Sequence, residues 1–253
     1  MSWGRRSRGR RNRESSWGFP PYITVAERKE DNEDLIAKMI KKGKSLDPVI
    51  IDARSIAKSV WGKAWCKHLE SFSDYENRLP RGRSYVRYGS VVNLDINQGQ
   101  IQAFVNGASL YTVDISIINI EQQKWQAIIR QCFGEVGSLI ELLQGKISSA
   151  VMNTMIDQKN GLFPSPNEIK FKCSCDDSAY MCKHVAATLY GVGARFDAKP
   201  ELLFMLRGVD HMDIIKSIDI NDKIQKPTQA KTIETQDLSS LFGIDIDIDE
   251  KNE

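Results

Sequence analysis

Residues 169–184 read IKFKCSCDDSAYMCKH and join a strand-like pattern to a dense cluster of cysteine and histidine. Ile169, Phe171 and Cys173 alternate with lysines, as in a half-buried strand. The spacing that follows is Cys-x-Cys, six residues, and then Cys-x-His. We therefore expect a strand or hairpin, a tight turn and a helix, held together by the sulfur and imidazole groups.

The cluster offers a complete set of zinc ligands. Three thiolates and one imidazole satisfy the four tetrahedral positions of Zn²⁺. Since the protein fills all four positions, no position remains for water or substrate. The pattern thus predicts a structural zinc site, with binding coupled to folding and worth on the order of 10 kcal/mol or more. The predicted ligands are Cys173, Cys175, Cys182 and His184.

The spacing also constrains the backbone. Residues two apart on a straight strand point to opposite faces, so the chain must bend at Ser174 for both sulfurs to converge. Cys182 and His184 converge if Cys182 lies just before a helix and His184 in its first turn.

Three other interpretations of the cysteines are weaker. Three incidental cysteines beside a core histidine would explain the composition, but metal-ligand spacing of this density seldom arises by accident. A redox pair usually has Cys-x-x-Cys spacing, which is absent. Cys66-x-His68 repeats half of the motif, but it lies within a predicted helix without a partner pair, so packing explains it better.

Outward from the cluster, the sequence predicts an α+β fold with an antiparallel meander. Strands are expected at 85–88, 91–96, 101–105 and 110–117, because turn signals such as Asn97-Gln98-Gly99 and Asn106-Gly107 separate them. A short strand is expected at 48–51. Helices are expected from Asn32 to a terminator at Gly43, after a cap at Ser55, around Trp125 to Phe133, around Val136 to Ile147, and along Val185, Leu189, Val192 and Phe196.

The two ends of the chain differ in charge. Residues 1–30 hold seven Arg and one Lys against three acids, whereas residues 232–253 hold seven acids against Lys251. We expect a disordered basic tail at 1–21, an α+β domain at 22–160, a zinc module at 161–210, and a linker with an acidic tail at 211–253. Within the tail, Leu238 to Ile244 is apolar and could dock on a partner or fold back.

The motif resembles the SWIM zinc finger. Three further stretches add to the resemblance: 60–65 (VWGKAW), 77–85 (NRLPRGRSY) and 111–113 (YTV). Over residues 48–207 the chain is similar to bacterial and archaeal SWIM zinc finger proteins, which are often encoded beside Swi/Snf-type helicase-like ATPases. The resemblance implies DNA or protein binding and a helicase-like ATPase as partner, and it supplies no catalytic residue.

Two basic elements are candidate nucleic-acid contacts. Arginines on a flexible tail can neutralise phosphates, although a solubilising tail is an equal alternative. A second group combines arginines with tyrosine, a pairing suited to a phosphate backbone and a stacked base, although the same arginines could pair with acids or solvate a strand. The tail group is Arg5, Arg6, Arg8, Arg10, Arg11 and Arg13, and the second group is Arg78, Arg81, Arg83, Tyr85 and Arg87.

No stretch of the sequence matches a catalytic template. Gly145-Lys146 lacks phosphate-loop spacing, and Gly191-x-Gly193 lies too late in a helix for a dinucleotide turn. We therefore expect no enzymatic activity and no small-molecule substrate. We also expect no membrane contact, because no apolar run approaches the roughly 20 residues that a membrane helix needs. Five cysteines, three of them clustered, and no evident secretory signal favour the cytoplasm.

Two functions remain open. The protein either binds DNA or RNA directly as a helicase-associated accessory factor, or serves as a protein-interaction adaptor without nucleic-acid affinity. Salt dependence separates them, because binding through several phosphates weakens steeply as salt rises.

Overall fold

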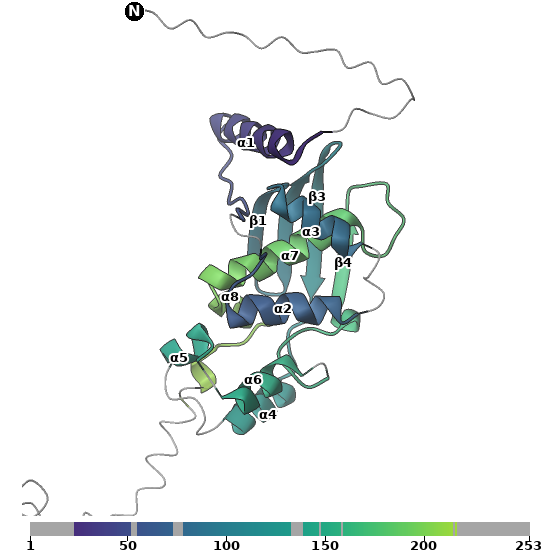
Figure 1. Ribbon diagram of the computed structural model, residues 1–253. Helices are drawn as coiled ribbons and strands as arrows, with labels where there is room; N and C mark the ends of the chain where they lie inside the picture. The colour runs from purple at the N-terminus through teal and green to yellow at the C-terminus, as the bar shows by residue number, and fades with distance from the viewer. Residues whose placement is uncertain are drawn as a thin grey trace, which may run out of the picture.

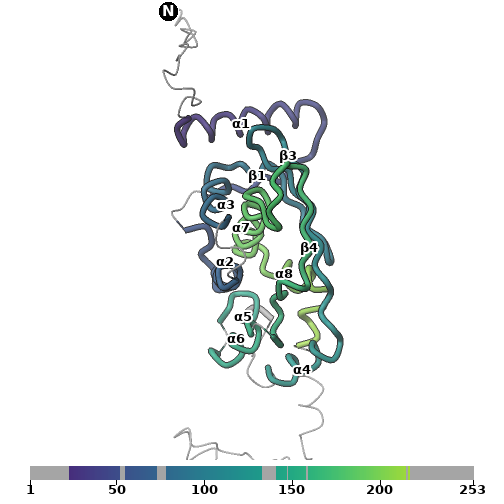
Figure 2. The backbone as a smooth tube through the Cα atoms, turned by 90° about the vertical axis from the view of Figure 1, so that its right-hand side faces the viewer, coloured from purple at the N-terminus to yellow at the C-terminus, as the bar shows by residue number. Residues whose placement is uncertain are grey.

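The computed structural model describes residues 23–51, 55–72, 78–132, 139–146, 148–157, 159–214 and 216. A four-stranded sheet forms one layer, helix α7 (Lys183–Ala198) crosses it, and α2 (Val60–Glu70) and α3 (Leu79–Arg87) lie over α7 (Figures 1 and 2). The α+β class is confirmed. The predicted basic tail at 1–21 lies outside the described residues. Of the predicted linker and acidic tail at 211–253, only residues 211–214 and 216 are described.

The sheet is antiparallel throughout, in the order β1-β2-β3-β4. Its strands are β1 (Val91–Asn97), β2 (Gln100–Asn106), β3 (Leu110–Ile117) and β4 (Ile169–Cys173). One face carries a buried row from each of the first three strands, such as Leu94, Ala103 and Ile115, while their neighbours in sequence are largely polar. This alternation places the core between the sheet and α7.

The fourth strand is not the one that the sequence predicts. Residues 85–88 were expected as a strand, but 85–87 form the end of α3 and Tyr88 is its C-cap; the buried residues Leu79, Gly82 and Val86 follow helical spacing. The fourth strand is instead β4, which pairs with β3 from Val113↔Cys173 to Ile117↔Ile169. The first half of the metal-binding motif therefore belongs to the main sheet. The domain limits predicted from the sequence stay a prediction.

Helix α7 is the centre of the fold. It contacts all four strands on one side and α2 and α3 on the other. Its residues from His184 to Gly193 are all buried. This burial on every face explains why the sequence shows an apolar segment here without a polar stripe.

Helices α2 and α3 approach α7 closely. A Cβ at Gly82 would overlap the Ala186 Cβ, and one at Gly193 would lie 2.8 Å from the Cys66 sulfur. The α2 cap is Ser59, whose side chain accepts from the Gly62 amide at 3.0 Å, so the cap expected at Ser55 was four residues too early.

Helix α1 (Val25–Lys41) begins earlier than Asn32, at a capping box formed by Thr24 and Glu27, and Gly43 follows its end with φ of 80°. Residues 48–51 form no strand in the described structure. The Val49 amide does bond to the Val91 carbonyl at 3.0 Å, so this segment runs beside β1 without a regular ladder.

The remaining helices cover one end of the sheet: α4 (Gln122–Cys132), α5 (Leu139–Gln144), α6 (Ser149–Ile156) and α8 (Glu201–Leu206), with a short 3-10 helix, η2 (Pro166–Glu168), before β4. The expected helix around Trp125 is confirmed as α4. The helix expected around 136–147 is only partly confirmed, because α5 stops before Gly145, which has φ of 69°. Phe133, Val136 and Ile147 lie outside the described residues.

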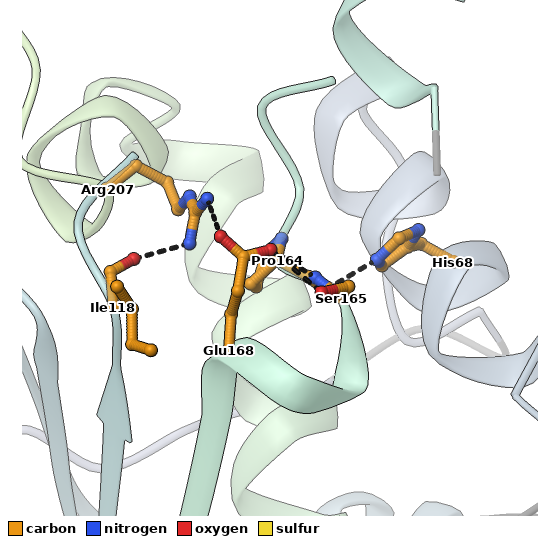
Figure 3. A network of polar contacts seen from close by, with 6 residues as sticks. All are labelled: His68, Ile118, Pro164, Ser165, Glu168 and Arg207. Atoms are coloured by element: carbon orange, nitrogen blue, oxygen red, sulfur yellow. Dashed lines mark hydrogen bonds and ion pairs between the residues drawn. The ribbon is translucent and has the colours of Figure 1, made fainter. Parts of the chain in front are cut away.

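A buried polar network joins this end of the molecule (Figure 3). The fully buried Arg207 donates to the Ile118 carbonyl at 2.5 Å and pairs with Glu168 at 2.6 Å. Burial of Glu168 opposes its ionisation, but hydrogen bonds from Arg207 and Ser165 outweigh burial and hold its pKa below the usual value. The network thus ties α8, β3 and η2 together.

Candidate metal centre

The four predicted ligands converge at one place. Cys173 ends β4, Cys175 follows a bend at Ser174, Cys182 is the N-cap of α7, and His184 lies in the first turn of that helix. Their ligand atoms all lie within 4.8 Å of one another. The bend and the cap position that the spacing predicted are both confirmed.

The distances between ligand atoms suit a tetrahedral ion. His184 Nδ1 lies 3.8 Å from the Cys173 sulfur and 3.9 Å from the Cys182 sulfur. Metal bonds of about 2.3 Å to sulfur and about 2.0 Å to nitrogen give tetrahedral S–N edges of about 3.5 Å. The donor set therefore fits a metal ion at its centre, with Nδ1 as the histidine ligand.

Hydrogen bonding with Cys173, and then with His184 and the Val185 amide, lowers the pKa of the Cys182 thiol. The Val185 amide lies 3.5 Å from the sulfur at the positive end of α7. In return, the same pairing raises the pKa of Cys173. Without a cation, the Cys182 thiolate is stabilised at the expense of the Cys173 thiolate. A cation at the centre stabilises both thiolates.

Two tyrosines hold the His184 ring in place. Tyr111 of β3 stacks on it, with centroids 4.1 Å apart and planes at 22°, and Tyr85 of α3 meets it edge-on at 5.5 Å. The second ring nitrogen, Nε2, is buried and has no hydrogen-bond partner among the described residues. Metal-bound histidines usually donate this N–H to an acceptor. Here aromatic packing, and not an acceptor, orients the imidazole.

Polar contacts brace the loop between the two halves of the motif. Arg78, at the start of α3, pairs with Asp177 at 3.1 Å, and Asp177 also accepts from the Ala179 amide at 3.1 Å. Ser174 exchanges two hydrogen bonds with Thr112 of β3, each 3.0 Å long. The cluster is thus anchored to α3 and to β3 as well as to its own elements.

The five predicted nucleic-acid contacts on and beside α3 fall into three sets. Arg78 and Tyr85 face the metal cluster, as described above. Arg83 turns toward α2, where it pairs with Glu70 and donates to the Tyr190 hydroxyl at 3.0 Å. Arg81 and Arg87 are exposed. The expected loop and strand is therefore a helix, and the tail group of Arg5 to Arg13 lies outside the described residues.

Sequence reasoning missed several residues of the site. Tyr111 contacts the cluster from a segment that gave no metal signal of its own, and Asp177 lies within the motif, where its contact with Arg78 could not be predicted. Residues 111–113 were linked to the zinc motif only through the family resemblance. Gly107 closes the site from the β2–β3 turn, where an added Cβ would lie 3.3 Å from His184 Nε2.

The thiols of Cys66 and Cys132 and the imidazole of His68 pack into the core, where Cys66 is half-buried and the other two are buried. Burial raises the pKa of Cys66 to about 12 and that of Cys132 to about 11. Burial also lowers the pKa of His68, whose Nε2 lies 2.9 Å from the Pro164 carbonyl (Figure 3). The half-motif at 66–68 thus does not join a metal cluster within the described residues.

Comparison with known proteins finds one protein that is similar in sequence. It is 32% identical over 175 residues to a protein of Mycobacterium tuberculosis described as "Uncharacterized protein Rv2102". The match covers 66% of this chain and 63% of that protein, so the chain spans less than two thirds of its relative. No family model matches the sequence, and no solved structure matches it.

Among the described helices, none has the length and apolar character needed to span a membrane.

Proposed function

We propose that this protein is a non-catalytic accessory factor that holds one structural zinc ion and binds nucleic acid. The observation that carries the proposal is the convergence of three sulfurs and one imidazole nitrogen within 4.8 Å. Because the protein supplies all four donors, an ion there has no open position for substrate. The expected role of the metal is to fix β4, the Cys175 loop and α7 as one unit.

Zinc is the ion that this donor set favours. Soft thiolates select zinc, copper(I) or iron–sulfur clusters, and a mixed set of three sulfurs and one imidazole is a common structural zinc shell. All five cysteines are free thiols. Reduced thiols of this kind suit a reducing compartment such as the cytoplasm, which we propose as the location.

Cationic side chains support the nucleic-acid part of the proposal. Arg81 and Arg87 on α3 and Lys63 and Lys67 on α2 are all exposed. Exposed cations gathered on neighbouring helices attract the phosphate backbone of DNA or RNA without sequence preference. The partnership with a Swi/Snf-type helicase-like ATPase rests on the resemblance to SWIM zinc finger proteins alone.

A protein-interaction adaptor is the alternative function. Arg78 and Arg83 already pair with acids of the same chain, which lowers the charge available to a nucleic acid. Tyr180, in the loop between Cys175 and Cys182, is 64% exposed, and Ile118, which follows β3 at the other end of β4, is 53% exposed. Exposed aromatic and aliphatic side chains of this kind favour a protein partner.

Binding across a salt series distinguishes the two functions. Fluorescence anisotropy with single-stranded and duplex oligonucleotides would be measured for the wild type and for a full-length variant with the six tail arginines changed to glutamine. Salt-sensitive binding that survives in the variant places the surface in the described domain. Absence of binding in both proteins would contradict the nucleic-acid function and favour the adaptor.

A further inference from the structure

A polar hollow of about 250 Å³ lies between α2 and α3, away from the metal cluster. Its lining includes Lys63, Lys67 and Glu70 from α2 and Arg83 and Arg87 from α3. Tyr190 of α7, fully buried, forms its floor. Four cationic side chains therefore surround this hollow against one carboxylate.

The carboxylate is neutralised within the wall of the hollow. Glu70 accepts from the Tyr190 hydroxyl at 2.8 Å and pairs with Arg83. Arg83 also donates to Tyr190 and lies 5.4 Å from the centroid of its ring. Burial raises the pKa of Tyr190, which keeps its hydroxyl protonated. Glu70, Arg83 and Tyr190 thus form a fixed unit whose two charges cancel.

The cations of α2 are available to a ligand. Lys63 and Lys67 lie one helical turn apart, are exposed, and form no ion pair within the described residues. Arg87 faces the same hollow from α3. Once the Glu70–Arg83 pair is discounted, Lys63 and Lys67 leave an excess of positive charge on the α2 wall of the hollow.

We propose that this hollow binds a phosphate group, held by Lys63 and Lys67 on one wall and Arg87 on the other. Lysine and arginine are the side chains that most often hold phosphates. The hollow falls below the range of about 300–1,000 Å³ that drug-sized ligands occupy, which suits a compact anion. Because the ring of Tyr190 is buried, no base can stack on it, and we expect the hollow to contact the phosphate and not the base.

The inference that this phosphate belongs to a nucleic-acid backbone rests on the proposed function. A free phosphate or pyrophosphate would use the same cations. The two sources differ in salt dependence, because a polyanion releases condensed counterions when it is neutralised and a small anion does not.

Neutralising the two lysines tests the site. The full-length K63Q/K67Q variant is compared with K38Q/K41Q, which removes the same charge from exposed positions on α1. Loss of this phosphate contact is expected to reduce the salt slope of duplex binding by about 0.9 and low-salt affinity on the order of 10-fold. The control variant is expected to bind as the wild type does. Zinc content and thermal midpoint verify that both variants fold.

A change of opposite sign gives a second test. E70Q removes the carboxylate that neutralises Arg83, so oligonucleotide affinity is expected to rise by about 2- to 5-fold. Equal or weaker binding by folded E70Q would argue against phosphate binding in the hollow.

Pyrophosphate titration, followed by NMR shifts of the α2 amides, separates failure of the site from failure of the function. Oligonucleotide binding that K63Q/K67Q leaves unchanged would overturn the site and retain the nucleic-acid function. Absence of oligonucleotide binding, with pyrophosphate shifts that the variant loses, would overturn the function and retain a phosphate site. Absence of both would overturn both.

Discussion

At the residue scale, His184 shows how two aromatic rings can orient a metal-ligating imidazole. Its Nδ1 points at two sulfurs, 3.8 and 3.9 Å away, while Tyr111 stacks on the ring. The ligands themselves could be predicted, because Cys-x-Cys and Cys-x-His put the donors on a bent strand and a helix start. Tyr111 and Asp177 could not, because their contacts depend on how β3 and α3 pack.

Thiol reactivity is expected to divide the five cysteines into two groups. Burial raises the pKa of Cys66 to about 12 and of Cys132 to about 11, so both stay protonated and slow to alkylate at pH 7.5. Once a chelator removes the metal, iodoacetamide is expected to modify Cys182 before Cys66 and Cys132, since hydrogen bonding lowers its pKa whereas burial raises theirs. Peptide mass spectrometry checks the order. Rapid labelling of Cys66 in the folded protein would contradict it.

At the element scale, α3 is where sequence pattern and structure disagree most. Tyr85 to Tyr88 resembles a strand when it is considered alone. The helix is set by Leu79, Gly82 and Val86, which are buried at helical spacing, and by Pro80 near its start. Burial against α7 decides the outcome, and a short window of sequence does not contain that information.

Substituting Gly82 by alanine is expected to destabilise the protein by about 1–3 kcal/mol. The new methyl group would lie 2.8 Å from the Ala187 nitrogen and 2.7 Å from the Ala186 carbonyl carbon, so α3 must move away from the α7 backbone. This clash outweighs the gain of about 1 kcal/mol in helix propensity. Urea denaturation measures the change.

R81A, an exposed change on the same helix, serves as the control, and its stability is expected to stay within about 0.5 kcal/mol of that of the wild type. Equal stability of G82A and the wild type would contradict the close packing.

At the scale of the whole molecule, the sheet combines segments that are far apart in sequence. The alternation at 91–117 predicts three of its strands correctly. The fourth place is taken by β4, which returns after α4, α5 and α6, and nothing in the local pattern indicates that long-range pairing. The strand at 169–173 was itself predicted, but its pairing with β3 was not.

The buried Arg207–Glu168 pair is expected to set part of the acid sensitivity of the fold (Figure 3). E168Q leaves the fully buried guanidinium without its charge partner, at a cost on the order of 3 kcal/mol near pH 7. Because the folded pKa of Glu168 is below its usual 4.5, its contribution is complete above that value and is lost as pH falls through the folded pKa.

The free energies of unfolding of the wild type and E168Q are therefore expected to converge below about pH 4.5. D47N, which removes the more exposed Arg195–Asp47 pair, serves as the control and is expected to change stability by less than about 1 kcal/mol. A gap between the wild type and E168Q that stays constant from pH 7 to pH 3 would contradict this assignment.

The central claim is that Cys173, Cys175, Cys182 and His184 hold one structural zinc ion. The most direct test is the zinc content of the purified chain and of C173S, C175S, C182S and H184Q, measured by inductively coupled plasma mass spectrometry, with C66S as the control. We expect one zinc per chain in the wild type and in C66S, and a loss of zinc in each ligand variant, with increased hydrogen exchange over residues 169–196. A full equivalent of zinc retained by C182S, or a wild-type chain that refolds and stays folded without zinc, would contradict the account.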